Sequence, residues 1–156
     1  MIVTTNYDYF LEELFSLPVD VGRNISSGSS INKILKVHGS QEQPESIVIL
    51  PSDYNQFSLN HKYIFSKLLV HFIEDTCLFL GYSLSDSHIQ TLLFDACEAT
   101  QREKLDNVFL LDYNDEPQTV KNDDTTFNLN RDRRSASINI IRATEFEWVY
   151  GVFAQN

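Results

Sequence analysis

The sequence predicts an α/β fold built on a doubly wound, mostly parallel sheet. Strand-like and helix-like segments alternate along most of the chain, which is the order expected of a parallel α/β protein. The segment "TCLFLGYS" is a fully apolar strand, and such strands suit a parallel sheet covered on both faces. The strand and helix units are too few for a closed barrel, and 156 residues fit one domain of ordinary size.

The first half of the chain opens with a strand that runs into a short helix. This helix is expected at about residues 9–14, and Asn6 or Asp8 is placed to cap its start. A cluster of Pro, Gly and Ser predicts a loop over residues 16–30. The strands expected in this half cover residues 2–5, 34–37 and 46–50.

Two amphipathic helices dominate the second half. Apolar side chains recur with helical spacing at 61–74 and again at 85–99, where Ser85 is the expected N-cap. A closing helix follows Thr144, which is its expected cap, and runs to about residue 153. The strands expected in this half cover residues 77–80, 107–113 and 137–143.

Residues 114–137 carry few apolar side chains, which predicts a flexible loop. The segments of the chain do not resemble one another closely enough for an internal repeat. We therefore expect a single domain over residues 1–156 with one flexible loop.

The composition excludes several classes of function. Twelve basic residues against 22 acidic ones give a net charge of −10, which repels a phosphate backbone and argues against a direct nucleic-acid partner. No apolar run approaches the roughly 20 residues of a membrane span, and the N-terminus has no signal-peptide pattern. We expect a cytoplasmic protein with no membrane partner. A small anionic ligand stays compatible with this charge, because backbone amides can bind it locally.

Polar segments follow three of the predicted strands. They are "TTNYD" at 4–8, "HG" at 38–39 and "GYSLSD" at 81–86. In an open parallel sheet the carboxyl ends of the strands face one crevice, so these segments are expected to converge there on a ligand. Gly81 lets the backbone approach a ligand closely, and the following helix is expected to point free N–H groups at a phosphate. His38 is the one histidine at a predicted strand end, where a general base would lie, whereas the other three fall on helices and are expected at the surface.

Each segment also has a simpler structural interpretation. Asn6 and Asp8 suffice to cap the first helix, and His38 with Gly39 suffices for a turn that holds a hydrogen-bonded histidine. Residues 81–86 suffice for an ordinary connection between a strand and a capped helix. The combination and order of the three segments favour the functional interpretation.

Taken in order, "TTNYD", "KVHGS", "IVILPSDY" and "LFLGYSLSD" resemble the sirtuin-like family, and in particular its bacterial NAD-hydrolysing branch associated with anti-phage defence. The counterparts of the family motifs are Thr4 to Asp8, His38 with Gly39, and Gly81 to Ser83. The resemblance covers residues 2 to about 95 and implies a Rossmann-like fold. Beyond that point only the strand pattern agrees.

Two departures from the family pattern are informative. Sirtuin deacylases carry zinc on paired Cys-x-x-Cys motifs, whereas Cys77 and Cys97 lie singly in apolar segments and predict buried thiols. We therefore expect no zinc or other metal, which favours the hydrolase branch. The family's first strand and its glycine-rich pyrophosphate loop should precede "TTNYD", so the resemblance implies a partial domain that lacks both elements.

The resemblance, together with the position of one further residue, assigns roles to seven residues. Asn6 would orient the nicotinamide riboside or the attacking water, Asp8 would lie near the nicotinamide, and His38 would act as general base towards a ribose hydroxyl or water. The reaction is cleavage of an N-glycosidic bond through an oxocarbenium-like state. Residues expected to bind the rest of NAD are Thr5, Gly81, Ser83 and Asp112, the last from its position at the end of "VFLLD" alone.

The function that these features predict is NAD hydrolysis, with NAD as substrate. The alternative is a non-catalytic module that binds NAD or ADP-ribose as a sensor, and protein deacylation is disfavoured by the missing zinc motifs. The resemblance also implies further domains in the parent protein. A missing central strand would weaken the isolated chain as an enzyme and would leave an apolar strand edge that favours self-association.

Overall fold

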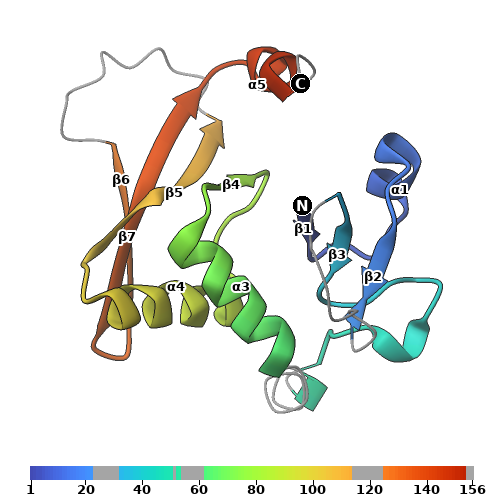
Figure 1. The fold of residues 1–156 in the computed structure, drawn as a ribbon, viewed down its shortest axis with the longest axis horizontal. Coiled ribbons are helices and arrows are strands. Elements are labelled where there is room, and N and C mark those ends of the chain that lie inside the picture. The colour runs from blue at the N-terminus through green and yellow to red at the C-terminus, as the bar shows by residue number, and fades with distance from the viewer. Residues whose placement is uncertain (23–31, 51, 54–61, 114–124, 154–156) are drawn as a thin grey trace. The chain divides into compact units, whose positions relative to one another are not determined.

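The computed structural model describes residues 1–22, 32–50, 52–53, 62–113 and 125–153, and it is a mixed α/β structure with mostly parallel strands. The predicted fold class is confirmed. The chain divides into two compact units, Met1–Ser66 and Lys67–Asn156, each of which is described by itself (Figure 1).

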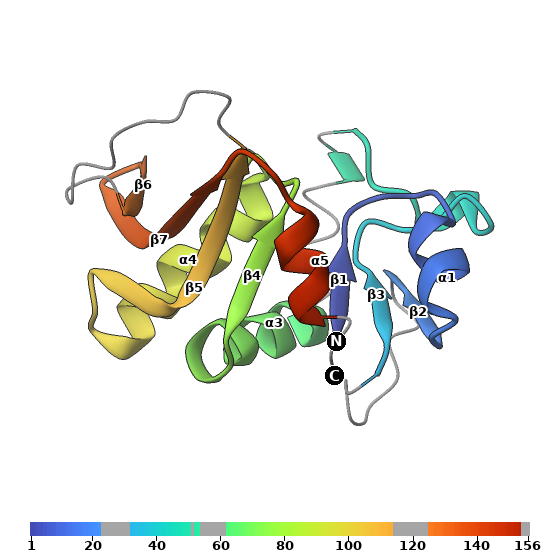
Figure 2. The ribbon, with the colours of Figure 1, turned by 90° about the horizontal axis from the view of Figure 1, so that it is seen from above.

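The first unit contains a three-stranded parallel sheet. Its strands are β1 (Ile2–Thr4), β2 (Val19–Val21) and β3 (Ile34–Lys36), in the order β1-β3-β2. Figure 2 shows β3 lying between its two neighbours. The six-residue helix α1 (Phe10–Phe15) follows β1. Every residue of β3 is buried, so this strand is the centre of the first unit.

Two expectations for the first unit are wrong. The predicted loop at 16–30 contains β2, a Val-Asp-Val strand between Pro18 and Gly22 that is too short to stand out from the turn residues around it. The predicted strand at 46–50 is absent, and the short 3-10 helix η2 (Pro44–Ser46) leads into this segment instead. Residues 23–31 of the predicted loop lie outside the described residues.

Side-chain hydrogen bonding explains the absent strand. The amides of Ile49 and Leu50 donate to Oδ2 of Asp53, at 3.2 and 2.8 Å, and are not available to a neighbouring strand. The bonds from Leu50 and Ile49 hold the pKa of the Asp53 carboxyl below its usual range. Asp53 thus closes a turn where the apolar run suggested a strand.

The second unit contains a four-stranded sheet in the order β4-β5-β7-β6. Its first three strands are parallel and β6 is antiparallel to β7. Helix α4 packs against β5 and β7. The strands are β4 (Cys77–Leu80), β5 (Lys104–Tyr113), β6 (Thr126–Arg131) and β7 (Arg134–Ala143), and the helices are α4 (Ser87–Thr100) and α5 (Glu147–Phe153).

The longest helix before this sheet is α3 (Lys62–Glu74), and the boundary between the units falls within it. The predicted helix at 61–74 is confirmed. No helix in the described segments is both long enough and apolar enough to cross a bilayer.

The segment predicted as a flexible loop at 114–137 is largely a β-hairpin. Residues 126–131 form β6, and Arg134 already begins β7 (Figure 1). The two turn residues, Asp132 and Arg133, have φ of 49° and 68°, which matches the right-handed twist of a tight hairpin. Only residues 114–124 of the prediction lie outside the described residues.

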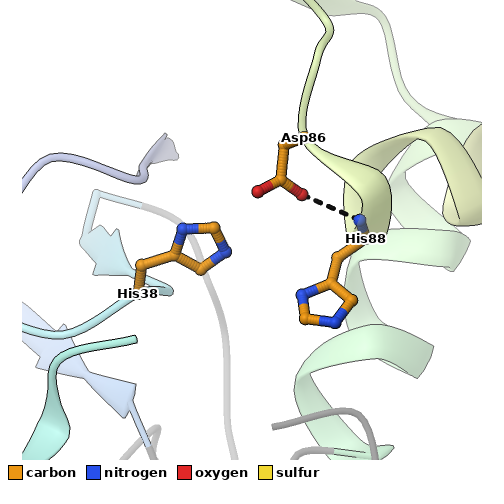
Figure 3. Close-up of side chains that lie close together, drawn as sticks. All are labelled: His38, Asp86 and His88. Carbon is orange, nitrogen blue, oxygen red and sulfur yellow. Dashed lines mark hydrogen bonds between the residues drawn. The ribbon is translucent and has the colours of Figure 1, made fainter. Parts of the chain in front are cut away.

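Two predicted helix caps are also wrong. Helix α4 is capped by Asp86 and not by Ser85, because the Asp86 Oδ1 accepts hydrogen bonds from the amide of His88 at 2.9 Å (Figure 3) and from that of Ile89 at 3.0 Å. Helix α5 begins at Glu147, three residues after Thr144, which is therefore too early to cap it.

Candidate active site

The first two predicted motifs lie side by side at the end of the first sheet. Strands β1 and β3 are parallel, and Thr4 is paired with Lys36. The Val37 amide also donates to the Thr4 carbonyl at 3.0 Å. Asn6 and His38 each follow their paired residue by two positions. The structure therefore brings the "TTNYD" and "HG" segments together within the first unit.

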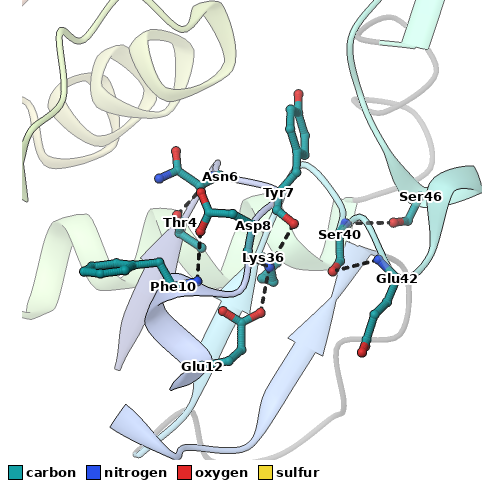
Figure 4. Close-up of polar contacts among 10 residues, drawn as sticks. All are labelled: Thr4, Asn6, Tyr7, Asp8, Phe10, Glu12, Lys36, Ser40, Glu42 and Ser46. Atoms are coloured by element: carbon teal, nitrogen blue, oxygen red, sulfur yellow. Dashed lines mark hydrogen bonds and ion pairs between the residues drawn. The ribbon is translucent and has the colours of Figure 1, made fainter. Parts of the chain in front are cut away.

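The loop after β1 presents its polar side chains outward. Asn6 and Asp8 are exposed, and Thr5 before them is half-buried. The Asn6 amide donates to Oγ1 of Thr4 at 3.1 Å, which closes a tight turn (Figure 4). Among the described residues none hydrogen-bonds the Asn6 carboxamide. This carboxamide is thus open to a ligand.

Neither residue proposed as the cap of α1 occupies the capping position. Tyr9 is the residue at the N-cap, and its side chain makes no capping bond. Oδ1 of Asp8 accepts a hydrogen bond from the amide of Phe10 at 3.0 Å, and Asn6 bonds no amide of the helix. Asp8 therefore satisfies one amide donor at the start of the helix, whereas Asn6 does not cap the helix.

The turn after β3 requires glycine. Gly39 has φ of +99°, and a Cβ there would lie 2.4 Å from the carbonyl oxygen of Ser46. No other residue fits such a contact without moving the backbone. His38, which precedes it, is 4% exposed, and its carbonyl accepts from the Val48 amide at 3.0 Å. The His-Gly pair is therefore fixed by the segment around η2.

Tyr7 links the two motifs to that same segment. Its hydroxyl donates to the carbonyl of Val48 at 2.8 Å, and its own carbonyl accepts from the amide of Gln41 at 3.1 Å. The loop after β1 is thus bound to residues that follow both β3 and η2.

Lys36, at the end of β3, is the residue that sequence reasoning missed. Its side chain is completely buried, and Nζ donates to the carbonyls of Tyr7 and Asp8 and to Oε1 of Glu12 (Figure 4). The signal was present in the sequence, since a lysine interrupts an otherwise apolar run, "ILKV". A charged residue inside such a run indicates a buried partner.

The other predicted ligand-binding residues lie at strand ends of the second unit. Strands β4 and β5 are parallel, with Leu80 paired with Leu111, so Gly81 and Asp112 follow neighbouring positions at the same end. Gly81 has φ of +59° and open space around it, and Ser83 is exposed. Whether these residues meet the same ligand as Asn6 and His38 stays a prediction.

Two features of this second strand end restrict its chemistry. Asp112 forms an ion pair with Arg142, with 3.8 Å between Oδ2 and Nε, so its carboxylate already has a partner. The expected free amides at the start of α4 are partly occupied, because Asp86 accepts from those of His88 and Ile89. An anion at this helix would have to displace a carboxylate.

The remaining histidines and the cysteines agree only in part with expectation. His71 on α3 and His88 on α4 are half-buried, and Nδ1 of His71 lies 2.5 Å from Oδ2 of Asp75. His61 lies outside the described residues. Both cysteines are free thiols, Cys97 buried and Cys77 half-buried.

These features define the class: an α/β protein of the Rossmann-like type, with polar motifs at the carboxyl ends of parallel strands. Residues 1–139 match the model of the SIR2-like domain family. The chain belongs to this family, and the predicted resemblance is confirmed.

Curated relatives point the same way. The chain is 23% identical over 159 residues to "Defense-associated sirtuin 2" of Bacillus subtilis, a match that covers 95% of this chain and 15% of that protein. It is 25% identical over 109 residues to "NAD(+) hydrolase ThsA" of Bacillus cereus (strain MSX-D12), covering 65% and 23% of the two chains. It is 30% identical over 101 residues to the protein of that name from Cytobacillus dafuensis, covering 58% and 20%. The chain thus spans less than a quarter of the length of these relatives.

Proposed function

We propose that this chain is the NAD-hydrolysing domain of a bacterial anti-phage defence protein. The observation that carries the proposal is the pairing of Thr4 with Lys36, which brings an exposed Asn6 and a buried His38 to the same end of one parallel sheet. Membership of the SIR2-like family supports it, as do relatives named NAD(+) hydrolase and defense-associated sirtuin. The proposal takes NAD as substrate, uses no zinc, and places the reaction in the cytoplasm.

The proposed reaction breaks the bond between C1′ of the ribose and the nicotinamide nitrogen. The bonding electron pair leaves with nicotinamide and neutralises its pyridinium charge, so an oxocarbenium-like centre develops at C1′. Water adds to C1′, and its proton passes to His38 as general base. The Asn6 carboxamide orients the water or the ribose, with Asp8 near the nicotinamide. The products are ADP-ribose, nicotinamide and a proton.

The other proposed contacts concern the remainder of the NAD molecule. We assign the adenosine side of NAD to Gly81 and Ser83, a ribose hydroxyl to Asp112, and a further contact with NAD to Thr5. For Asp112 the assignment requires that a ribose hydroxyl compete with Arg142 for the carboxylate.

Nicotinamide release by the intact protein tests the proposal. The Asn6→Ala and His38→Ala variants are expected to lose about 100-fold or more in turnover, since positioned acid–base groups typically contribute that much. Matched controls are Asn130→Ala, on the exposed side of β6, and His71→Gln, on α3, which are expected to keep turnover within about twofold. Unchanged turnover in both site variants would refute the proposed roles.

Binding separates the proposed enzyme from a sensor. Calorimetry with NAD and with ADP-ribose measures affinity without reference to catalysis. If the wild-type protein binds NAD or ADP-ribose tightly but releases no nicotinamide, the sensor function is favoured and the hydrolase proposal is refuted.

A further inference from the structure

The ammonium of Lys36 donates hydrogen bonds to one short segment of the chain, residues 7–12. Nζ lies 3.3 Å from the carbonyl oxygen of Tyr7 and 2.6 Å from Oε1 of Glu12, and it also donates to the carbonyl of Asp8. An ammonium has three N–H donors, so all of them are used (Figure 4). Tyr9 adds its ring, whose centre lies 5.4 Å from Nζ.

Stability alone does not account for a lysine at this position. Burying an ammonium is costly even when it is paired, and apolar side chains of similar volume often replace buried ion pairs without loss. The neighbours of Lys36 on β3, Ile34 and Leu35, are fully buried and apolar. A residue of their kind would suit the strand, yet would remove a donor from each of two loop carbonyls, of which the Tyr7 carbonyl would keep the amide of Gln41.

Those two carbonyls determine the shape of the loop that carries Asn6. The carbonyls of Tyr7 and Asp8 point inward to Nζ, which fixes the peptide groups on either side of Asp8, the second and third after Asn6. The bond from the Asn6 amide to Oγ1 of Thr4 fixes the peptide before it. Asn6 is therefore held from both sides, and its free carboxamide is exposed.

We propose that Lys36 is a positioning residue, which acts through the backbone of Tyr7 and Asp8 to present Asn6 to the nicotinamide riboside. The inference rests on the function proposed above. Well-aligned groups contribute strongly to rate, and a displacement of about 1 Å costs on the order of 100-fold. Loss of the Lys36 donors therefore acts on the chemical step more than on the binding of NAD.

The main experiment compares two lysines of the same sheet in the intact protein. Lys36→Met keeps the length of the side chain and removes its donors. Lys33→Met is the matched control, because Lys33 also forms an ion pair, at 3.2 Å with Asp20, at the other end of β3. We expect kcat for nicotinamide release to fall about 100-fold in Lys36→Met with KM within about threefold, and both to stay within about twofold in Lys33→Met.

Two further variants separate positioning from folding. Glu12→Gln removes the charge partner but leaves Nζ on the two carbonyls, so kcat is expected to fall by less than about fivefold. In the double variant Glu12→Gln/Lys36→Met no unpaired buried charge remains, and the urea midpoint is expected to rise above that of Lys36→Met. If kcat also returns in the double variant, Lys36 acts through folding and the inference is overturned.

Amide hydrogen exchange decides the inference if the wild-type protein releases no nicotinamide, an outcome that would refute the proposed function by itself. The readouts are the amides of Asn6 and of Gln41, which donate to Thr4 and Tyr7. Faster exchange at both in Lys36→Met, but not in Lys33→Met, supports the positioning role. Unchanged exchange at both in Lys36→Met overturns it.

Discussion

The carboxyl ends of β3 and β4 are both polar connections that contain a glycine, but they are built differently. After β3 the chain stays buried as far as Ser40, and its backbone is bound by residues from the β1 loop and from η2. After β4, Gly81 and Ser83 are exposed, and the Ser83 hydroxyl makes a local contact with that of Ser85 at 2.8 Å. The first end is held by long-range contacts, and the second by its own turn and the α4 cap.

The effect of a motif residue on stability therefore depends on how closely the surrounding residues pack against it. Gly39 and Gly81 are both in the left-handed region and both belong to family motifs, yet only one of them is enclosed. We therefore expect substitutions at the first strand end to spread through the unit, and substitutions at the second to stay local.

The largest expected effect is that of Gly39→Ala. The new Cβ would overlap the Ser46 carbonyl, and φ of +99° is unfavourable for any residue with a side chain, so we expect a loss of about 3 kcal/mol in unfolding free energy. Gly81→Ala is the matched control, with an expected loss of about 1 kcal/mol because only its left-handed φ is unfavourable. Urea unfolding measures both variants. Equal losses of unfolding free energy would mean that the two strand ends do not differ in how tightly their glycines are enclosed.

A smaller effect is expected from Asp86→Ala at the start of α4. This change removes the acceptor for the amides of His88 and Ile89 and should cost about 1 kcal/mol. Ser85→Ala, one residue earlier, removes an exposed hydroxyl and is expected to change stability by less than about 0.5 kcal/mol. The same urea titration checks both variants, and a larger loss from Ser85→Ala would reinstate Ser85 as the cap.

The pH dependence of stability gives a still smaller effect. Burial, with a contribution from the Asp75 carboxylate, raises the pKa of the Cys77 thiol from 9.0 to about 11. The thiol form is thus favoured in the folded state, so stability is fully present below pH 9 and is lost as pH rises from about 9 to 11. Because the side chain is half-buried, solvent screening should keep this loss below about 1 kcal/mol.

A variant that lacks the Cys77 thiol checks that assignment. Thermal unfolding at pH 8 and pH 10.5 is compared for wild type and Cys77→Ala. The variant is expected to lose less stability between the two pH values, and parallel losses would mean that another group is responsible.

The smallest effect is expected from Asp112→Asn at the end of β5. Its partner Arg142 is 3.8 Å away and both side chains are partly exposed, so the pair should contribute about 0.5 kcal/mol or less. Added salt should weaken this contribution further in wild type and leave the variant unaffected. A loss above about 1 kcal/mol would mean that the second strand end is more tightly coupled to its sheet than its contacts indicate.

The long, strongly patterned elements were predictable from the sequence, and the short ones were not. Helices α3 and α4 follow from apolar periodicity, because burial of one face requires it, and strands β4, β5 and β7 follow from their apolar runs. The strands β2 and β6 were not predicted. Strand β2 has only three residues between Pro and Gly, and β6 alternates weakly within a polar segment. Local hydrogen bonds that backbone amides donate to the carboxylates of Asp53 and Asp86, which periodicity does not encode, explain the errors at 46–50 and at Ser85.

The positions of the site motifs at the strand ends were predictable, but the buried residue that holds the Asn6 loop was not. The side-by-side position of the segments that carry Asn6 and His38 follows from parallel pairing of the strands before them. The buried Lys36 does not, because strand alternation says which face a residue occupies and not whether a loop will cover that face.

The Tyr7 contacts have a consequence for the order in which the first unit folds. Its hydroxyl bonds a carbonyl 41 positions later in the chain, and the bonds that Lys36 makes to the same loop span 28 and 29 positions. Contacts of such separation form only after the intervening chain has closed, which makes them late events in folding. During synthesis from the N-terminus, "TTNYD" leaves the ribosome long before its partners do. The loop that carries Asn6 therefore acquires its full set of contacts only once residue 48 has emerged.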